Sequence, residues 1–300
     1  MEDNFTFIGE VGGPAVATIL IIEMILALIA NGVVLSITLY QRKSWKQPST
    51  IFFTSLILAH FVLNLLYLPF IIVTFVAREW VVGSTDEEKK WTCYYITFIF
   101  WWMVLVIFMT LAAVSFDRFL FIVKPHLHKR FMRPWVALTL TIAIWIFSAI
   151  YSIVQIFGFH LYIAICLTPA AGIGVFFFLL SVTSIILVII FVTSLWTFCF
   201  TKSFFKDQSL IAGESVYASK KKRLFGIFGS MLLIYGICFV PGVIYFFLSL
   251  VIVLPLWFDI FATICFLFIT VANPVIQSYF RPEIKSVLVS YFPFLFCVCC

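Results

Sequence analysis

Charged side chains are scarce in this sequence. Only 11% of its 300 residues are Asp, Glu, Lys or Arg, whereas 64% are hydrophobic. A soluble domain carries about 25% charged residues, and a disordered chain has low hydrophobicity, so this composition excludes both classes. We therefore expect lipid to surround most of the chain.

Residues from which catalytic and metal sites are built are also few. The sequence has four histidines, and its eight cysteines do not show zinc-ligand spacing. It has no Gly-rich phosphate loop and no nucleophile elbow. We therefore expect neither an enzyme nor a cofactor or metal site. The net charge of +6 lies in the loops, which leaves no basic face for nucleic acid.

Long apolar runs dominate what remains. About 20 apolar residues are needed to cross about 30 Å of hydrocarbon, and a crossing segment must satisfy its own backbone hydrogen bonds. The sequence therefore predicts an all-α membrane protein, a seven-transmembrane helix bundle between a tail over residues 1–14 and a C-terminal segment over 281–300. The predicted spans are about 15–40, 48–77, 91–123, 134–156, 171–201, 222–252 and 255–279.

Lys and Arg gather in the loops after the first, third, fifth and seventh runs. The opposite side carries only Arg78, Lys89 and Lys90, among several acids. The positive-inside rule then predicts an extracellular N-terminus and a cytosolic C-terminus. The N-terminal residues lack the basic region of a signal peptide, so the first span is expected to act as an uncleaved anchor. Asn4 begins a glycosylation sequon on the outer side.

Two features of the C-terminal segment concern the inner membrane surface. Residues 281–296 form a short amphipathic pattern with basic residues at its start, which predicts a helix lying along that surface. Three cysteines follow it on the cytosolic side, where palmitoylation is favoured over pairing. They are Cys297, Cys299 and Cys300.

Polar residues inside the runs are candidates for function, because charge is costly in lipid. Asp117 and Arg118 stand together at the end of the third run, before a basic stretch. Glu23 either faces the bundle or extends to the outer interface. Asn31 is expected to form hydrogen bonds between helices. His60 is either a neutral imidazole bonded to Asn31, Asn64 or water, or a proton-sensitive switch.

These residues, in this order, resemble the rhodopsin-like (class A) G-protein-coupled receptors. The matching motifs are Asn31, residues 56–60, residues 80–83, Cys93 with Cys166, residues 117–119, Pro125, Trp145, residues 238–241 and Asn273 with Pro274. His60 and Phe239 narrow the resemblance to a group of orphan receptors. The resemblance implies a multi-pass receptor in the plasma membrane, with heterotrimeric G proteins and an extracellular ligand of unknown identity as its partners.

The resemblance also implies roles for individual residues. Cys93 and Cys166 are expected to form a disulfide in the oxidising outer compartment. Arg118 is expected to be held by Asp117 in the inactive state and released toward the G protein. The coupling and activation set is Asp117, Arg118, Phe119, Lys221, Phe239, Pro241, Asn273 and Pro274. The expected ligand-cavity set is Phe70, Thr97, Phe100, Trp101, Val104, Phe246, Asp259 and Thr263.

Several positions depart from the family pattern. His60 stands where the family has a sodium-binding aspartate, so we expect no sodium site, because an imidazole is a poor ligand for a hard cation. Lys221 stands where many receptors have an acid, and we expect it to repel Arg118 and raise basal activity. Phe100 replaces the aspartate of amine receptors, which favours a hydrophobic or lipid-like ligand. These apolar residues could equally serve only to pack the bundle.

A small transporter is the alternative from another class. Glu23 and His60 would then form a proton relay across the bundle. Transporters often contain inverted repeats and paired broken helices, and the sequence shows no convincing internal repeat. A channel subunit is not favoured either, since no ring of acids and no carbonyl filter sequence is present.

Overall fold

A computed structural model describes residues 12–41, 47–158, 173–212, 234, 236–245, 247–248, 252 and 254–291. Within these residues the chain is almost wholly helical. The elements are α1 (Gly13–Tyr40), α2 (Pro48–Leu66), α3 (Leu68–Ala77), α4 (Asp86–Val123), α5 (Pro125–Phe131), α6 (Pro134–Ile153), the π-helical turn η2 (Val154–Gly158), α7 (Ile173–Ala212), α9 (Leu256–Phe280) and α10 (Pro282–Tyr291). Residues Gly236–Tyr245 form a further apolar helical segment.

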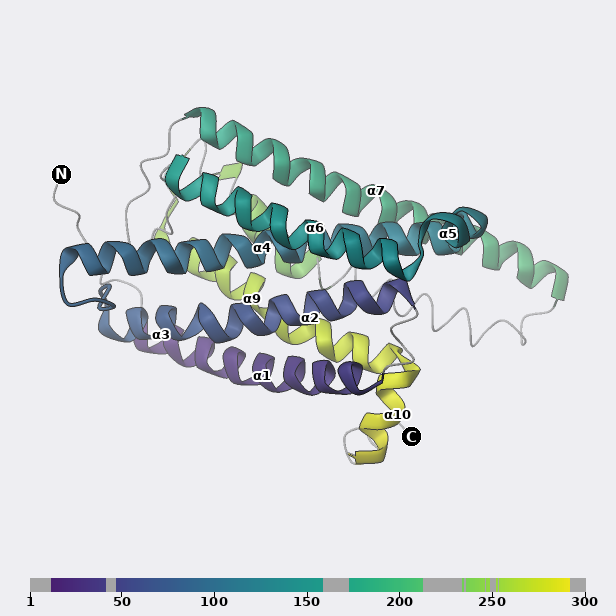
Figure 1. Ribbon diagram of the computed structural model, residues 1–300, viewed down its shortest axis with the longest axis horizontal. Helices are drawn as coiled ribbons and strands as arrows, with labels where there is room; N and C mark the ends of the chain where they lie inside the picture. The colour runs from purple at the N-terminus through teal and green to yellow at the C-terminus, as the bar shows by residue number, and fades with distance from the viewer. Residues whose placement is uncertain are drawn as a thin grey trace.

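The long helices run side by side as one bundle (Figure 1). In the described residues, five helices are long and apolar enough to cross a membrane: Gly13–Tyr40, Pro48–Ala77, Asp86–Val123, Pro134–Phe157 and Trp257–Ile276. They coincide with the first, second, third, fourth and seventh predicted spans. Shorter apolar helices, Ser184–Phe200 and Gly236–Tyr245, lie within the fifth and sixth. The prediction of an all-α membrane bundle is therefore confirmed.

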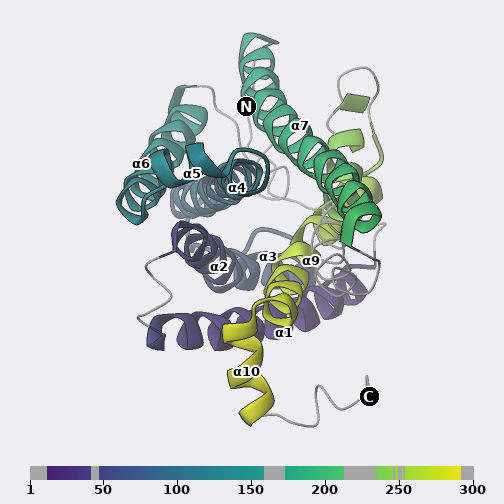
Figure 2. The same ribbon diagram turned by 90° about the vertical axis from the view of Figure 1, so that its right-hand side faces the viewer.

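The α4 helix lies between α2, α6 and α7 in the bundle, as the end-on view shows (Figure 2). Indole groups link these helices. Trp102 on α4 donates its Nε1–H to the Trp145 carbonyl on α6 at 3.1 Å, and Trp145 donates in turn to the Ser55 hydroxyl on α2 at 2.8 Å. Hydrogen bonds between helices matter in a bundle whose surroundings are as apolar as its core, since burial alone gives little driving force there.

The core and the lipid-facing surface are both apolar. Leu20, Leu63 and Met103 are buried where α1, α2 and α4 meet, whereas Ile22 and Ile29 on the outer side of α1 are more than half exposed. Exposed aromatic residues mark both ends of the bundle. Trp91 and Trp257 lie at the starts of α4 and α9, and Tyr40 and Trp135 lie at the opposite end. Such girdles are typical of the two membrane interfaces.

Helix ends depart from the predicted spans in three places. The second span is interrupted at Tyr67, two residues before Pro69 in the first turn of α3, because proline cannot donate the hydrogen bond that would continue the helix. The stretch after the third span, predicted as a loop, forms the two-turn helix α5 with Pro125 in its first turn. The α7 helix continues to Ala212, well past the predicted limit at residue 201.

The turn before α4 is fixed by local hydrogen bonds. Thr85 accepts from the Glu88 N–H at 3.2 Å while the Glu88 carboxylate accepts from the Thr85 N–H, which makes a capping box. Trp80 is fully buried in this turn, and its indole donates to Thr92 on α4. Gly83 has φ +129°, a conformation that side chains disfavour.

At the other end of the bundle, α10 turns away from α9 (Figure 1). Ile284 of α10 is buried against Val34 and Phe53, and Leu288 packs on the same cluster. This placement confirms the predicted amphipathic helix after the seventh span. It also brings α10, α5 and the C-terminal end of α7 to the same end of the molecule, opposite the α4 N-terminus (Figure 1).

Candidate functional site

The candidate coupling site lies at the end of α4. Asp117 is only 2% exposed, and its Oδ1 lies 3.0 Å from Nε2 of His128 on α5. Among the described residues, this is the one contact of the Asp117 carboxylate with a basic side chain within 4.0 Å, and none is formed with its neighbour Arg118. The acid of the predicted pair is therefore held by α5, a partner that the sequence did not suggest.

Arg118 and Phe119 follow Asp117 on α4, at the end where α5 and α7 pack beside it. Arg118 is partly buried. The Phe119 ring contacts Trp196 on α7 edge-on, with centroids 5.5 Å apart, and Phe121 makes a similar contact with the His128 ring at 5.3 Å. Phe119 and Phe121, which follow Arg118 on α4, thus pack against α7 and α5.

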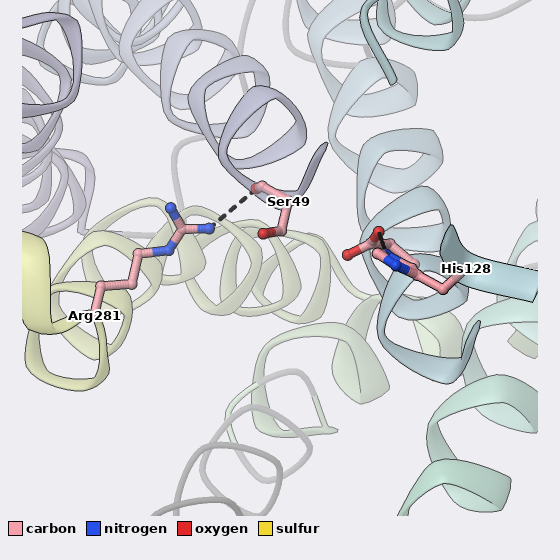
Figure 3. A network of polar contacts seen from close by, with 4 residues as sticks. Ser49, His128 and Arg281 are labelled. Atoms are coloured by element: carbon pink, nitrogen blue, oxygen red, sulfur yellow. Dashed lines mark hydrogen bonds and ion pairs between the residues drawn. The ribbon is translucent and has the colours of Figure 1, made fainter. Parts of the chain in front are cut away.

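A second cation, Arg281, joins the start of α10 to the start of α2. Its guanidinium donates to the Ser49 carbonyl at 3.0 Å and to the Thr50 hydroxyl at 3.4 Å, and lies over the Phe53 ring at 4.2 Å. Figure 3 shows this contact together with that of His128. Arginine suits such a position because its planar fork can donate to two acceptors while it stacks on a ring.

Polar residues cluster on the inward faces of α1, α2 and α9. Asn31 donates to the Ala27 carbonyl at 2.7 Å and to the Thr270 carbonyl on α9 at 2.8 Å, so it makes the predicted kind of interhelical contact. His60 and Asn64 are fully buried. Asn64 donates to the His60 carbonyl at 2.7 Å, and neither ring nitrogen of His60 has a partner in the described part of the chain.

Glu23 faces the bundle and is only 8% exposed. It does not extend to the outer interface, which was the other possibility that the sequence left open. No hydrogen bond between Glu23 and His60 occurs among the described residues, so the two groups do not form the direct relay that the transporter alternative requires.

A series of aromatic contacts runs from the break between α2 and α3 to the segment Gly236–Tyr245. Tyr67 packs against Phe100 on α4 at 4.8 Å, and Phe100 packs against Phe266 on α9 at 6.4 Å. Phe108 then meets both Phe266 at 6.2 Å and Phe239 at 4.8 Å. Phe239, one of the predicted activation residues, is thus packed against Phe108 of α4 and Phe266 of α9.

Comparison with known proteins decides the family. The sequence pattern of the 7 transmembrane receptor (rhodopsin family) matches residues 30–277, most of the chain. The chain belongs to the rhodopsin family of seven-transmembrane receptors. The seven-helix architecture follows from this membership, and the receptor is a multi-pass membrane protein.

Individual relatives are distant. The receptor is 27% identical over 147 residues to mouse G-protein coupled receptor 161, a match that covers 49% of this chain and 26% of that protein. It is 26% identical over 148 residues to mouse galanin receptor type 3, covering 48% and 38%. It is 32% identical over 127 residues to human hydroxycarboxylic acid receptor 3, covering 41% and 30%. The chain thus spans about a quarter of the first relative's length. The narrower resemblance, to the orphan group around G-protein coupled receptor 141, stays a prediction.

The predicted ligand-cavity residues that the structure describes lie on α3, α4 and α9. Thr97 and Val104 are buried in the described structure, whereas Phe100, Trp101 and Asp259 are partly exposed. Phe100 and Trp101 are in edge-on contact, with centroids 5.3 Å apart. Phe70 and Thr263 are also partly exposed. The prediction missed Tyr67, which contacts Phe100 from the break between α2 and α3.

The remaining predicted activation residues that the structure describes lie in the segment Gly236–Tyr245 and in α9. Pro241 is partly buried in the segment Gly236–Tyr245, and Asn273 is buried on α9. Pro274 stands inside α9, where the Ser278 hydroxyl donates to its carbonyl at 2.6 Å. Proline lacks the N–H that would reach the Thr270 carbonyl one turn earlier. Asn31 of α1 donates to that carbonyl instead at 2.8 Å, which makes the proline tolerable within a membrane helix.

Several predicted sites of the receptor fall outside the described residues. They are Asn4, Cys166, Lys221, Phe246, Cys297, Cys299 and Cys300. Cys93 is fully buried near the start of α4 and is disulfide-bonded, but the identity of its partner stays a prediction.

Sequence reasoning missed His128 and Arg281 as contact residues of the receptor. His128 reaches Asp117 across 11 positions, and Arg281 reaches Thr50 across 231. Only the fold brings such residues together. The available signal was weak: His128 is one of two histidines in a stretch otherwise rich in Lys and Arg, and Arg281 directly follows the last span.

Proposed function

We propose that this receptor passes an extracellular signal to heterotrimeric G proteins at the end of the bundle where α5, α10 and Arg118 lie. The observation that carries the proposal is the family match over residues 30–277. The position of Asp117 and Arg118 supports it, because an acid and a cation at a helix end, beside a helix with an exposed basic side, can change partners between two states.

The proposed orientation places the N-terminus outside and the C-terminus in the cytosol of the plasma membrane. Lys124, Lys129, Arg130 and Lys285 lie at the proposed inner end of the bundle. The opposite end carries the acidic first turn of α4, with Asp86, Glu87 and Glu88. This asymmetry supports the orientation through the positive-inside rule.

We further propose a hydrophobic or lipid-like ligand rather than an amine. Phe100 occupies the position where an amine would need an acid, and it belongs to the aromatic series that runs to Phe239. Asp259 is the polar contact candidate at the outer start of α9. The relatives' names include a galanin receptor and a hydroxycarboxylic acid receptor, so they do not select one ligand class.

The absence of sodium regulation remains part of the proposal. His60 is fully buried at the position in question, and a hard cation prefers carboxylate and carbonyl oxygens. Raised basal activity caused by Lys221 is proposed on sequence grounds alone. The transporter alternative is not favoured, because the family match is to receptors.

The test is a G-protein activation panel in cells without added ligand. The native receptor is compared with Arg118→Ala, and Arg78→Ala serves as control because Arg78 is an exposed arginine at the opposite end. We expect Arg118→Ala to lose the basal signal at equal surface expression, and Arg78→Ala to keep it. A signal that Arg118→Ala retains in full would contradict the proposal.

A further inference from the structure

The contact between α4 and α5 is built around one buried carboxylate. Asp117 is 3% exposed at its side chain and His128 is 15% exposed, with 3.0 Å between Oδ1 and Nε2. A carboxylate buried this deeply needs a hydrogen-bond donor or a positive charge to offset its lost hydration. Within the described residues His128 is the donor that meets this need.

The backbone of His128 is hydrogen-bonded within α5, while its side chain contacts Asp117 on α4. Its N–H donates to the Lys124 carbonyl at 3.0 Å, and its own carbonyl accepts from Met132 at 2.8 Å. Leu127 and Met132 pack on a small cluster with Phe52 of α2 and Leu120 of α4. The histidine is therefore a fixed part of α5, and its bond to Asp117 fixes α5 on α4.

Charges around the pair are otherwise positive. On α4 the neighbour is Arg118. The segment from 124 to 133 adds Lys124, His126, Lys129, Arg130 and Arg133, all exposed. The α2 helix packs against this region and contains no Asp, Glu, Lys or Arg from Pro48 to Leu66. In α2, α5 and residues 111–123 of α4, Asp117 is thus the one acid for which His128 and Arg118 can compete. The α7 helix, which meets Phe119 through Trp196, has Lys202, Lys206 and Asp207 further along its sequence.

We propose that His128 is a positioning residue that competes with Arg118 for Asp117, and that its protonation shifts the competition. A protonated imidazole makes a charge-assisted bond, which is stronger than the bond of the neutral ring. It therefore holds α5 more firmly and leaves Arg118 free to meet a G protein. Since imidazole changes charge between pH 5 and 8, cytosolic acidification raises ligand-independent coupling. This inference rests on the proposed function.

The first experiment needs no G protein. The receptor in lipid nanodiscs is compared with His128→Gln, which keeps a neutral donor, and with His126→Gln, which changes an exposed histidine of the same helix. Hydrogen exchange of the α5 amides is measured at pH 6 and pH 8. At pH 6 we expect native protection to exceed that of His128→Gln by about threefold or more, and the excess to shrink at pH 8.

Two further comparisons complete the hydrogen-exchange experiment. His126→Gln should match the native protein at both pH values. In an Asp117→Asn background, His128→Gln should have no effect, because its partner is already neutral. Equal protection of native and His128→Gln receptors at both pH values would overturn the inference, and so would an unchanged effect of His128→Gln without the Asp117 carboxylate.

The second experiment measures G-protein activation with the cytosolic face at pH 6.5 and pH 7.5. We expect the basal signal of the native receptor and of His126→Gln to rise about twofold on acidification, and that of His128→Gln to stay level. A native signal as level as that of His128→Gln overturns the inference while the proposed function stands. No native signal at either pH, with the α5 protection as expected, overturns the proposed function and the coupling role of His128 together.

Discussion

At Arg281 one guanidinium connects parts of the chain that are 231 and 232 positions apart. Two acceptors at the start of α2 and the ring of Phe53 surround it. The contact explains how a short helix can keep a fixed place after the bundle has ended, since α10 has only one apolar side to bury. The same side chain therefore relates the position of α10 to that of α2.

Replacing Arg281 by lysine tests whether its shape matters beyond its charge. An ammonium group cannot donate to Ser49 and Thr50 while stacking on Phe53, so we expect Arg281→Lys to lower stability by about 1–2 kcal/mol. Thermal unfolding of the detergent-solubilised receptor measures the effect. Lys129→Ala, an exposed cation on α5, is the control and should unfold with the native protein. Equal midpoints for native and Arg281→Lys would show that charge alone suffices.

Arg78 is the one non-glycine residue of the described chain with positive φ, at 60°. It ends α3 in the left-handed conformation, which costs a side-chain-bearing residue about 1 kcal/mol. We expect Arg78→Gly to stabilise the receptor by about that amount. Arg78→Ala keeps the strained Cβ and should give no such gain. The thermal midpoints of the two variants settle the matter, and a gain shared by both would point to the loss of the charge instead.

At the scale of helices, α1 contains two glycines in different surroundings. A Cβ on Gly13 would lie 2.5 Å from the Phe75 carbonyl oxygen of α3, whereas one on Gly32 would lie 3.7 Å from the Phe61 ring, an ordinary contact. Alanine favours a helix by about 1 kcal/mol over glycine. The two positions therefore separate close helix packing from helix propensity.

We expect Gly13→Ala to destabilise the receptor by about 1–3 kcal/mol, because a backbone oxygen cannot move aside as a flexible side chain can. Gly32→Ala should be neutral or stabilising by up to about 1 kcal/mol. Thermal unfolding of both variants at equal lipid and detergent content tests the pair. A destabilised Gly32→Ala together with an unaffected Gly13→Ala would contradict the packing of α1 against α3.

Helices were predictable from the sequence where hydropathy alone decides them. The apolar runs locate the five long helices, and Pro69 indicates the break before α3. The C-terminal end of α7 was not predictable in this way, because hydropathy falls near Lys202 while the helical backbone continues to Ala212. Helical hydrogen bonding does not depend on lipid, and Lys stems can extend from the membrane edge into water.

The candidate site was predictable only in part. The motif around Asp117 and Arg118 is contiguous, so the sequence indicates it directly. The bond from Asp117 to His128 depends on α5 folding back onto α4, and a hydropathy pattern contains no information about that fold. The aromatic series was likewise predictable only in part. The sequence indicates Phe100 and Phe239, but their connection through Phe108 and Phe266 depends on how α4, α9 and the segment Gly236–Tyr245 pack together.

On the scale of the whole molecule, the charged residues and the exposed aromatic residues both distinguish the two ends of the helix bundle. Trp91 and Trp257 mark one interface, and Tyr40 and Trp135 mark the other. The basic residues of α5 and α10 lie beyond the second girdle. If that end is cytosolic, the acidic first turn of α4 and the predicted sequon at Asn4 must face outward.

An orientation test follows directly. We expect an epitope tag at the N-terminus to bind antibody on intact cells, and a C-terminal tag to bind only after permeabilisation, because Lys and Arg are retained on the cytosolic side during insertion. Asn4→Gln should remove a glycosidase-sensitive mass difference, while Asn64→Gln, at a buried position within α2, should leave it. The reverse antibody pattern would place α5 and Arg118 outside the cell, where no G protein could reach them, and would contradict the proposed coupling end.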